Sequence, residues 1–396
     1  MARQLMNLRL FNPGCELEVA NGSPYFQLPK HPAMIEDDLS TLPMFFSNDG
    51  DYIVVNQIPN EAYISFWKQY YNVNFIQSDN YNNLSGLYFD GFAPWGISPR
   101  AWNIAEKFKN AFSDGYRFGF KDQQKMLFNR ATSAELFRMF LDKCHDSEMY
   151  PSVEQYPFVA ATSKQAFDYF HYAASRFGGV VFKALYGSSG RGVRIFRRNE
   201  LSDNILQWTD FVIKSHGGVE CEPYYNKVRD FSAHFDIVDG KPIFCGFSRF
   251  DTTESGFYRS SKVKKFNDLE FFDKNDTLKF VRTLKYCLAL SPYSRMYKGP
   301  LGIDCMVYSE ANGGLKINPC VEVNCRHSMG RLAMEIENLV SDSSEADYYV
   351  LQDDAIKQFE QQKPVFKDGK LESGFLRMTP EGSQRFAAGI LAKPLK

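Results

Sequence analysis

Two segments near residue 300 carry acidic and amide side chains whose spacing could hold a metal ion. Asp304 lies in Gly-Ile-Asp-Cys-Met-Val-Tyr, and Glu322 and Asn324 lie in Val-Glu-Val-Asn. Alternation along a strand places residues 322 and 324 on one face, and a hairpin would bring Asp304 beside them. Two carboxylates and one amide oxygen form a hard oxygen site suited to Mg²⁺. The alternative is a half-exposed sheet whose polar face carries these residues, which would be the better explanation of Glu-x-Asn alone.

A run of small residues at 187–192, Gly-Ser-Ser-Gly-Arg-Gly, could let the backbone approach phosphate oxygens closely. A P-loop needs a Lys-Ser/Thr pair and a following helix, and a dinucleotide fingerprint also needs that helix. Here a β-branched segment at 193–196 follows instead. Lys183 precedes the loop, which is the reverse of the protein-kinase order. The pattern indicates a β-hairpin flap with Lys183 on its incoming strand, although a lone strand lysine more often faces solvent.

Periodicity predicts the elements that would position these groups. Thr162 and Gln165 fit a capping box for a helix that Gly178-Gly179 ends. Asp239-Gly240 is a strong hairpin signal. We expect helices over residues 60–71, 126–143 (with a break and new cap near Thr132-Ser133), 162–177 and 275–290, and strands over 52–55, 180–186, 193–196, 231–238, 242–250, 302–308 and 315–323. The last fifty residues show no pattern that we can assign.

Composition excludes several classes of protein. The 396 residues carry a formal net charge of -1, which offers neither a basic footprint for nucleic acid nor a polybasic membrane patch. No apolar run reaches the roughly 18 residues of a membrane helix, and the N-terminus is unlike a signal peptide. The eight cysteines are scattered singly, which favours reduced thiols over zinc ligands. We therefore expect a cytoplasmic protein without nucleic-acid or membrane partners; a homo-oligomer is left open.

The order of these features along the chain resembles that of the ATP-grasp superfamily, over roughly residues 119–335. Lys183 comes first, then the small-residue run at 187–192, and then the segments that carry Asp304, Glu322 and Asn324. The resemblance implies an α+β ATP-grasp fold, in which two subdomains grip ATP, behind an N-terminal α/β pre-ATP-grasp domain. The implied domains are residues 1–118, the ATP-grasp domain at 119–345 (flap-bearing subdomain about 150–222, Mg-binding subdomain about 223–345), and a C-terminal segment at 346–396. Residues 11–24 and 94–96 resemble uncharacterised bacterial ATP-grasp proteins in particular.

The resemblance also implies roles for individual residues. Lys183 would contact the phosphates of ATP, with Arg130 (or, less well, Lys125) as the earlier basic phosphate ligand. The flap would be Gly187, Ser188, Ser189, Gly190 and Gly192; the adenine-binding hinge strand would supply Glu220, Glu222 and Tyr224; Asp230 would bind ribose; and Asp304, Glu322 and Asn324 would bind Mg²⁺, or Mn²⁺ in its place. The spacing from Glu222 to Asp230 and the hairpin between Asp304 and Glu322 are both longer than usual.

The chemistry implied is ATP-dependent joining of a small-molecule carboxylate to an amine. Arg326 and Lys183 would be catalytic, with Arg326 holding the transferring phosphoryl group or the substrate carboxylate; the alternative for Arg326 is a surface arginine paired with an acid. A small-molecule kinase of the same fold and a nucleotide-binding module without turnover are the other two hypotheses. Arg249 and Arg259 could line the acceptor site, and His327 could touch substrate or be a structural hydrogen-bonding group; the sequence does not decide these roles.

Overall fold

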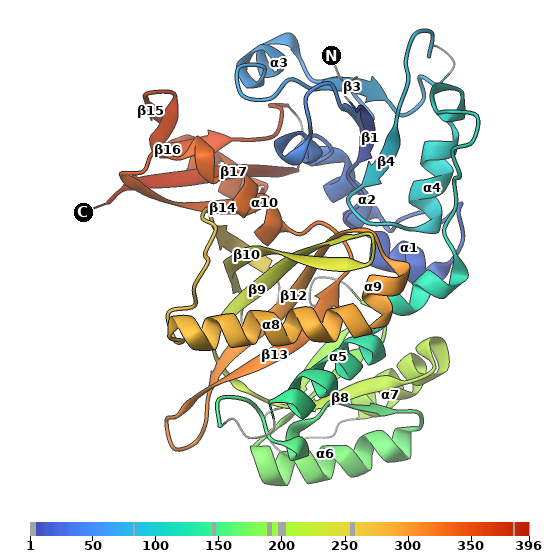
Figure 1. Cartoon of the computed structure of the whole chain (residues 1–396), viewed down its shortest axis with the longest axis vertical. Helices are drawn as coiled ribbons and strands as arrows, with labels where there is room; N and C mark the ends of the chain where they lie inside the picture. The colour runs from blue at the N-terminus through green and yellow to red at the C-terminus, as the bar shows by residue number, and fades with distance from the viewer. Residues whose placement is uncertain are drawn as a thin grey trace. The chain divides into compact units, whose positions relative to one another are not determined.

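The computed structural model describes residues 5–81, 84–144, 148–187, 192–196, 203–253, 258–382 and 385–395. The chain divides into two compact units (Figure 1). The first unit comprises Met1–Asp122, Arg259–Lys265 and Arg326–Lys396, and the second comprises Gln123–Tyr258 and Phe266–Cys325. The domain boundaries expected after residues 118 and 345 stay predictions.

The N-terminal part of the first unit is an α/β layer, as expected. Its parallel sheet has the strand order β3-β2-β1-β4. The strands are β1 (Asn7–Leu10), β2 (Tyr52–Val55), β3 (Asn74–Gln77) and β4 (Gly91–Pro94), and the helices are α1 (Cys15–Asn21), α2 (Lys30–Asp38), α3 (Glu61–Trp67) and α4 (Pro99–Glu106), with 3-10 turns at Leu42–Phe46 and Lys109–Ala111. Leu8, Val54 and Phe108 are buried together in its core.

The C-terminal part of the first unit, which the sequence left unassigned, is mainly antiparallel. β14 (Ser344–Gln352) pairs with β11 (Tyr258–Lys262) and with β17 (Phe386–Pro394). β16 (Lys370–Arg377) joins β17 to β15 (Val365–Lys367). Helices α10 (Met329–Glu335) and α11 (Asp354–Glu360) and a 3-10 turn at Glu337–Leu339 complete this part.

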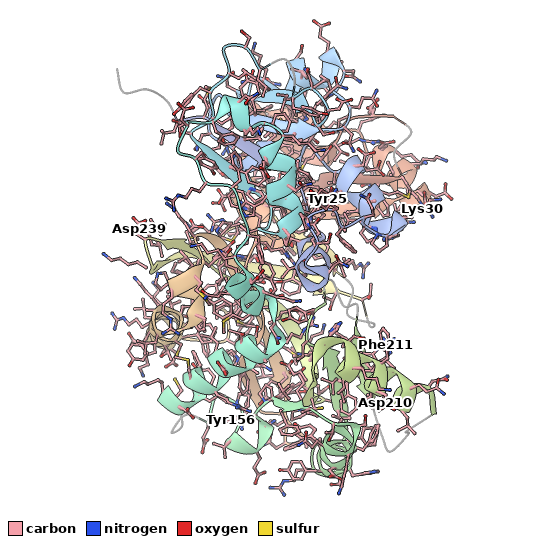
Figure 2. All side chains as sticks on the ribbon, turned by 90° about the vertical axis from the view of Figure 1, so that its right-hand side faces the viewer. Tyr25, Lys30, Tyr156, Asp210, Phe211 and Asp239 are labelled. Carbon is pink, nitrogen blue, oxygen red and sulfur yellow. The ribbon has the colours of Figure 1, made fainter. Side chains whose placement is uncertain are left out.

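The second unit contains a small antiparallel sheet with two helices packed against it. The strand order is β5-β8-β6-β7, formed by β5 (Phe158–Ala160), β6 (Val180–Ala184), β7 (Val193–Phe196) and β8 (Val219–Pro223). Helices α6 (Ser163–Phe177) and α7 (Asp203–His216) bury their apolar faces on it through Phe170 and Val212. The neighbouring Phe211 points outward with 66% of its surface exposed (Figure 2), so α7 is amphipathic.

The rest of the second unit is built on long antiparallel strands in the order β13-β12-β9-β10. They are β9 (Asn226–Val238), β10 (Lys241–Thr252), β12 (Gly299–Ser309) and β13 (Leu315–Asn324). Asp239 and Gly240 join β9 to β10 with positive φ angles of 47° and 74°, which confirms the expected tight turn. Helices α5 (Arg130–Lys143), α8 (Lys274–Leu290) and α9 (Pro292–Met296) belong to the same unit, with 3-10 turns at Asp122–Phe128 and Val153–Gln155.

Two local expectations are corrected. The break expected at Thr132-Ser133 is absent, since α5 runs unbroken from Arg130 to Lys143 with Asn129 as its cap. Ser133 instead accepts a hydrogen bond of 3.1 Å from the Val323 backbone N–H. The helix expected over residues 60–71 ends at Trp67. No helix in the described ranges combines the length and the apolar character needed to cross a membrane.

Candidate nucleotide and metal site

Lys183 lies on the face of the small sheet that points away from helices α6 and α7. Val180, Phe182 and Ala184 of β6 enter the hydrophobic core with those helices, so alternation turns Lys183 to the other face. β8 brings Glu220 directly opposite Lys183 and Glu222 opposite Val181. Lys183 therefore faces away from the core that Phe182 and Ala184 enter. This is not the solvent-facing alternative, because Lys183 is only 5% exposed.

Two buried carboxylates hold the Lys183 ammonium. Its Nζ lies 2.7 Å from Glu222 and 3.4 Å from Glu220. Burial by itself would lower the pKa of Lys183, but Glu222 and Glu220 outweigh that effect, so its pKa lies above the ordinary value. Burial raises the pKa of Glu220 to about 7, although Lys183 opposes this change. Lys183 therefore remains charged, whereas burial disfavours the charged form of Glu220.

Arg130 is a second buried cation, at the start of α5. Its backbone N–H donates to the Leu185 carbonyl at 3.0 Å, and its side chain donates to the Ala184 carbonyl at 2.5 Å. The guanidinium also pairs with Glu322 at 2.9 Å. Burial would lower the pKa of Arg130, and Glu322 and Glu220 more than compensate. The side chain is thus fixed between the end of β6 and strand β13.

The three predicted metal ligands lie on neighbouring strands. Asp304 on β12 is opposite Glu322 on β13, and Asn324 is opposite Gly302. The Asn324 amide nitrogen donates to one Asp304 oxygen at 2.9 Å, and Ser232 on β9 donates to the other at 2.6 Å. Directly opposed residues point to the same side of a sheet, so Glu322 shares this face. Asn324 presents its amide oxygen, the atom that would bind a metal, on the side away from that hydrogen bond.

Strand β13 connects the cationic and the oxygen-rich groups. Lys183 donates to the Val321 carbonyl at 3.3 Å, and the next residue, Glu322, holds Arg130. Two cations suited to phosphate oxygens therefore lie next to a set of oxygen ligands suited to a divalent cation. The described residues hold no cluster of three His, Cys, Asp or Glu side chains that could bind a metal without an amide or a phosphate. The donor set fits an ion that shares its shell with a nucleotide.

Comparisons with known proteins bear on this arrangement. No protein-family profile matches the sequence, and no curated protein is detectably similar to it. The fold matches solved structures. Phosphoribosylamine–glycine ligase from Thermotoga maritima aligns with a TM-score of 0.52 at 11% identity, over 98% of this chain and 92% of that one. An N5-carboxyaminoimidazole ribonucleotide synthetase solved with ADP aligns with a TM-score of 0.51 at 12% identity, over 99% and 94%.

A third similar structure is the biotin carboxylase domain of 2-oxoglutarate carboxylase from Hydrogenobacter thermophilus, solved with MgADP, ADP and bicarbonate. It aligns with a TM-score of 0.50 at 13% identity, over 99% of this chain and 87% of that one. The chain has the ATP-grasp fold. At these identities the likeness concerns the fold alone, so the roles of individual residues rest on the geometry of this chain.

The expected flap of the ATP-grasp fold is described only at its two ends. Gly187 is buried, and Ser188, Ser189 and Gly190 lie outside the described residues. The Gly192 carbonyl accepts a 2.8 Å hydrogen bond from the Ala184 N–H. Gly192 has a φ of 79°, and a Cβ there would lie 3.0 Å from the Ala184 Cβ. Glycine is therefore favoured at this position, directly before β7.

The adenine and ribose assignments rest on fewer contacts. Tyr224 follows β8, and its N–H donates to the Gly179 carbonyl at 3.0 Å. Asp230 lies two residues before Ser232 on β9 and binds Lys227 at 2.6 Å. Lys125, the weaker alternative to Arg130, lies over the Tyr186 ring at 5.3 Å from its centroid. The roles of Tyr224 and Asp230 remain predictions.

Arg326 and His327 belong to the first unit. Arg326 binds Glu16 on α1 through its Nε and donates to the His327 carbonyl at 3.0 Å. The His327 ring stacks on Phe46 with centroids 3.9 Å apart. The sequence left two alternatives for Arg326: a catalytic role, or pairing with an acid. Arg326 does pair with an acid, Glu16, and its catalytic role remains a prediction. Of the unassigned arginines, Arg249 pairs with Glu270 at 2.5 Å and Arg259 is exposed.

Two serines that hold the site were not selected from the sequence. Ser232 orients Asp304, and Ser133 holds the β13 backbone beside Glu322. The signal for Ser232 is its place in residues 231–237, where Phe231, Ala233 and Phe235 are fully buried and Ser232 lies on the other face, opposite Asp304. Serine on that face is too common to be chosen without knowing the strand partners.

The raised pKa of Glu220 predicts a pH-dependent effect of removing its charge. Between the ordinary value of 4.5 and about 7, the folded chain binds more protons than the unfolded chain, so Glu220 lowers stability as pH rises. The free energy of unfolding of Glu220→Gln, measured relative to that of the parent chain, should therefore be higher at pH 8 than at pH 5, by on the order of 2 kcal/mol. Denaturant unfolding at both pH values measures this. Replacing the exposed Glu154 with Gln should give no such pH-dependent difference. An equal effect of Glu220→Gln at both pH values would contradict a raised pKa for Glu220.

Proposed function

We propose that this chain is a Mg²⁺-dependent ATP-grasp ligase that activates a small-molecule carboxylate as an acyl phosphate and joins it to an amine. The observation that carries the proposal is the position of Lys183 and Arg130 beside Asp304, Glu322 and Asn324, connected through β13. Buried cations and a hard oxygen set side by side fit a triphosphate with its metal. The ATP-grasp fold, shared with ligases solved with ADP or MgADP, supports the same proposal.

The proposed roles follow from charge and geometry. Lys183 and Arg130 bind phosphate oxygens, for which they exchange part of their contact with Glu222, Glu220 and Glu322. Asp304, Glu322 and Asn324 would hold Mg²⁺, which supplies charge neutralisation at the transferring phosphoryl group. Strand β8, which carries Glu220 and Glu222 and is followed by Tyr224, is proposed to receive adenine, and Asp230 is proposed for ribose. Arg326 is proposed to hold the phosphoryl group or the substrate carboxylate.

The chemical steps are those of carboxylate activation. A carboxylate oxygen attacks the γ-phosphorus, the bond to the β-phosphate bridging oxygen breaks, and ADP leaves. An amine then attacks the acyl carbon, inorganic phosphate leaves, and the amine loses a proton. The protein contributes positioning and electrostatic stabilisation to both steps. The identity of the acid and the amine is open.

Oxygen transfer tests this chemistry. The purified chain is incubated with Mg-ATP, amines and a pool of carboxylic acids labelled with ¹⁸O in the carboxylate. We expect ADP and inorganic phosphate to appear together only with a matching acid and amine, with one ¹⁸O atom per phosphate because the acyl phosphate retains a carboxylate oxygen. Mass spectrometry of the phosphate measures the label. Phosphate without ¹⁸O would reject the acyl phosphate and indicate ATP hydrolysis, and a stable phosphoester product would reject the ligase and favour the kinase hypothesis.

A further inference from the structure

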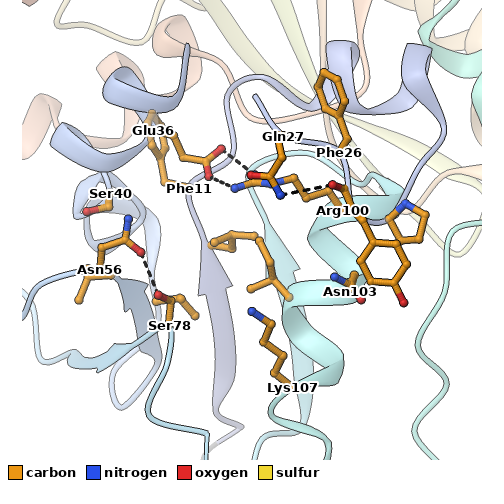
Figure 3. Close-up of a pocket in the computed structure, with 16 residues that line it drawn as sticks. Phe11, Phe26, Gln27, Glu36, Ser40, Asn56, Ser78, Arg100, Asn103 and Lys107 are labelled. Carbon is orange, nitrogen blue, oxygen red and sulfur yellow. Dashed lines mark hydrogen bonds and ion pairs between the residues drawn. The ribbon is translucent and has the colours of Figure 1, made fainter. Parts of the chain in front are cut away.

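A cavity of about 460 Å³ lies within the first unit, at the carboxyl edge of its parallel sheet. Leu10 and Val55, the last residues of β1 and β2, and Ser78, just after β3, contribute to its wall (Figure 3). The strand order β3-β2-β1-β4 reverses direction beyond β1, and helix α4, which follows β4, closes the cavity. Open parallel sheets bind ligands at such a reversal, and this volume is typical of small-molecule sites.

One face of α4 lines the cavity with polar side chains. Arg100, Asn103 and Lys107 are spaced by three and four residues, which places them on one side of the helix. Arg100 is already neutralised inside the protein, because its guanidinium forms two hydrogen bonds to Glu36, at 2.7 and 3.1 Å, and one to Glu18 at 2.9 Å. Glu18 is fully buried. Arg100 is thus already paired within the protein, so we do not expect it to bind the charge of a ligand.

The two neighbouring groups on α4 have no such partners. Within the described residues, neither the Asn103 amide nor the Lys107 ammonium forms a hydrogen bond or ion pair. Figure 3 shows the Lys107 amine directed toward the middle of the cavity. Across from α4, Ser78 donates to Asn56 at 2.9 Å, and Asn56 in turn donates to Asp37 at 2.8 Å. The Ser78 oxygen is therefore held in place with its acceptor capacity available.

We propose that this cavity binds a small hydroxylated acid, whose carboxylate or phosphate pairs with Lys107. Its hydroxyl groups would bond to Asn103 and Ser78, and its carbon skeleton would pack on Leu10 and Phe11. An exposed cation without a partner, a positioned hydroxyl, an unpaired amide and an apolar floor at a sheet reversal match this chemistry. The proposal does not depend on ATP binding, because every group that it uses lies in the first unit.

Binding measurements on the whole chain, without nucleotide, test the proposal. The probes are glycerate, gluconate and glucose 6-phosphate, with glycerol and glucose as neutral counterparts; gluconate and glucose 6-phosphate separate carboxylate from phosphate. By saturation-transfer NMR and calorimetry, at least one acid should bind at least about tenfold more tightly than its neutral counterpart, because an ion pair is added.

Variants locate the binding. Lys107→Gln should weaken binding of that acid about ten- to hundredfold, whereas Lys109→Gln, on the following 3-10 turn, should leave it unchanged. Binding is measured without nucleotide, so failure of the proposed ligase activity would not affect this result. The proposal is overturned if no acid binds, if neutral probes bind equally well, or if Lys107→Gln binds as the parent chain does.

Discussion

Replacing Asp304 with asparagine is expected to remove most of the Mg²⁺-dependent affinity of the chain for an ATP analogue. Both Asp304 oxygens are held, one by Ser232 at 2.6 Å and one by Asn324 at 2.9 Å. Asparagine keeps an oxygen that can accept from Ser232, so the shape of the site is retained while the charge is lost. Loss of a charged metal ligand should weaken binding at least about a hundredfold.

Calorimetry with AMP-PNP, with Mg²⁺ and with EDTA, measures this difference without knowledge of the acid or the amine. In the parent chain Mg²⁺ should strengthen binding, and in Asp304→Asn the two conditions should give nearly the same affinity. Glu310→Gln is the matched control, since Glu310 lies at the turn of the same hairpin, where it pairs with Lys316 at 2.9 Å. Undiminished Mg²⁺-dependent binding by a folded Asp304→Asn protein would remove Asp304 from the proposed metal site.

The shared face of Glu322 and Asn324 could be predicted from the sequence, but the register that brings Asp304 to them could not. The alternation around Glu322 and Asn324 sets which side chains share a face, and the polar segment between the strands limits how they can pair. A register shift between Asp304 and Met306 places Asp304 opposite Glu322; without that shift, the pairing that starts at Ser309 and Leu315 would place Cys320 there.

Burial and partner choice could not be predicted, because both depend on residues far apart in the sequence. A strand lysine is usually exposed, and nothing near Lys183 shows that Glu220 and Glu222 will surround it. Arg130 and Glu322 form an ion pair although they lie near opposite ends of the second unit in the sequence. Ser133 looked like a helix cap because capping is local, but its hydroxyl is used by the backbone of β13.

The C-terminal strands escaped assignment for a related reason. β14 pairs with β17 and with the distant strand β11, so each strand is stabilised mainly by partners that its own sequence does not indicate. Ala387 and Ala388 are consecutive and both fully buried, so β17 does not show the period of two that identifies a half-exposed strand. Such a segment cannot be distinguished from a buried helix by pattern alone.

Replacing Lys183 with methionine should have the second large effect, in two separable parts. The variant leaves Glu220 and Glu222, which are 2% and 4% exposed, without the cation that lies between them. Breaking a buried ion pair in this way costs about 3–5 kcal/mol of folding free energy. Nucleotide affinity should also fall, by at least about tenfold, because a charged phosphate contact is lost. Lys164→Met, on the exposed surface of α6, should change neither property.

A second substitution separates these two effects. Adding Glu222→Gln to Lys183→Met leaves the net charge of the cluster as it is in the parent chain, so most of the lost stability should return. Nucleotide affinity should stay low, because neither methionine nor glutamine replaces the ammonium at the phosphates. Denaturant unfolding and AMP-PNP calorimetry measure the two properties independently. If affinity recovers together with stability, Lys183 serves only to neutralise its two carboxylates, and the phosphate contact must come from another cation, of which Arg130 is the nearest through β13.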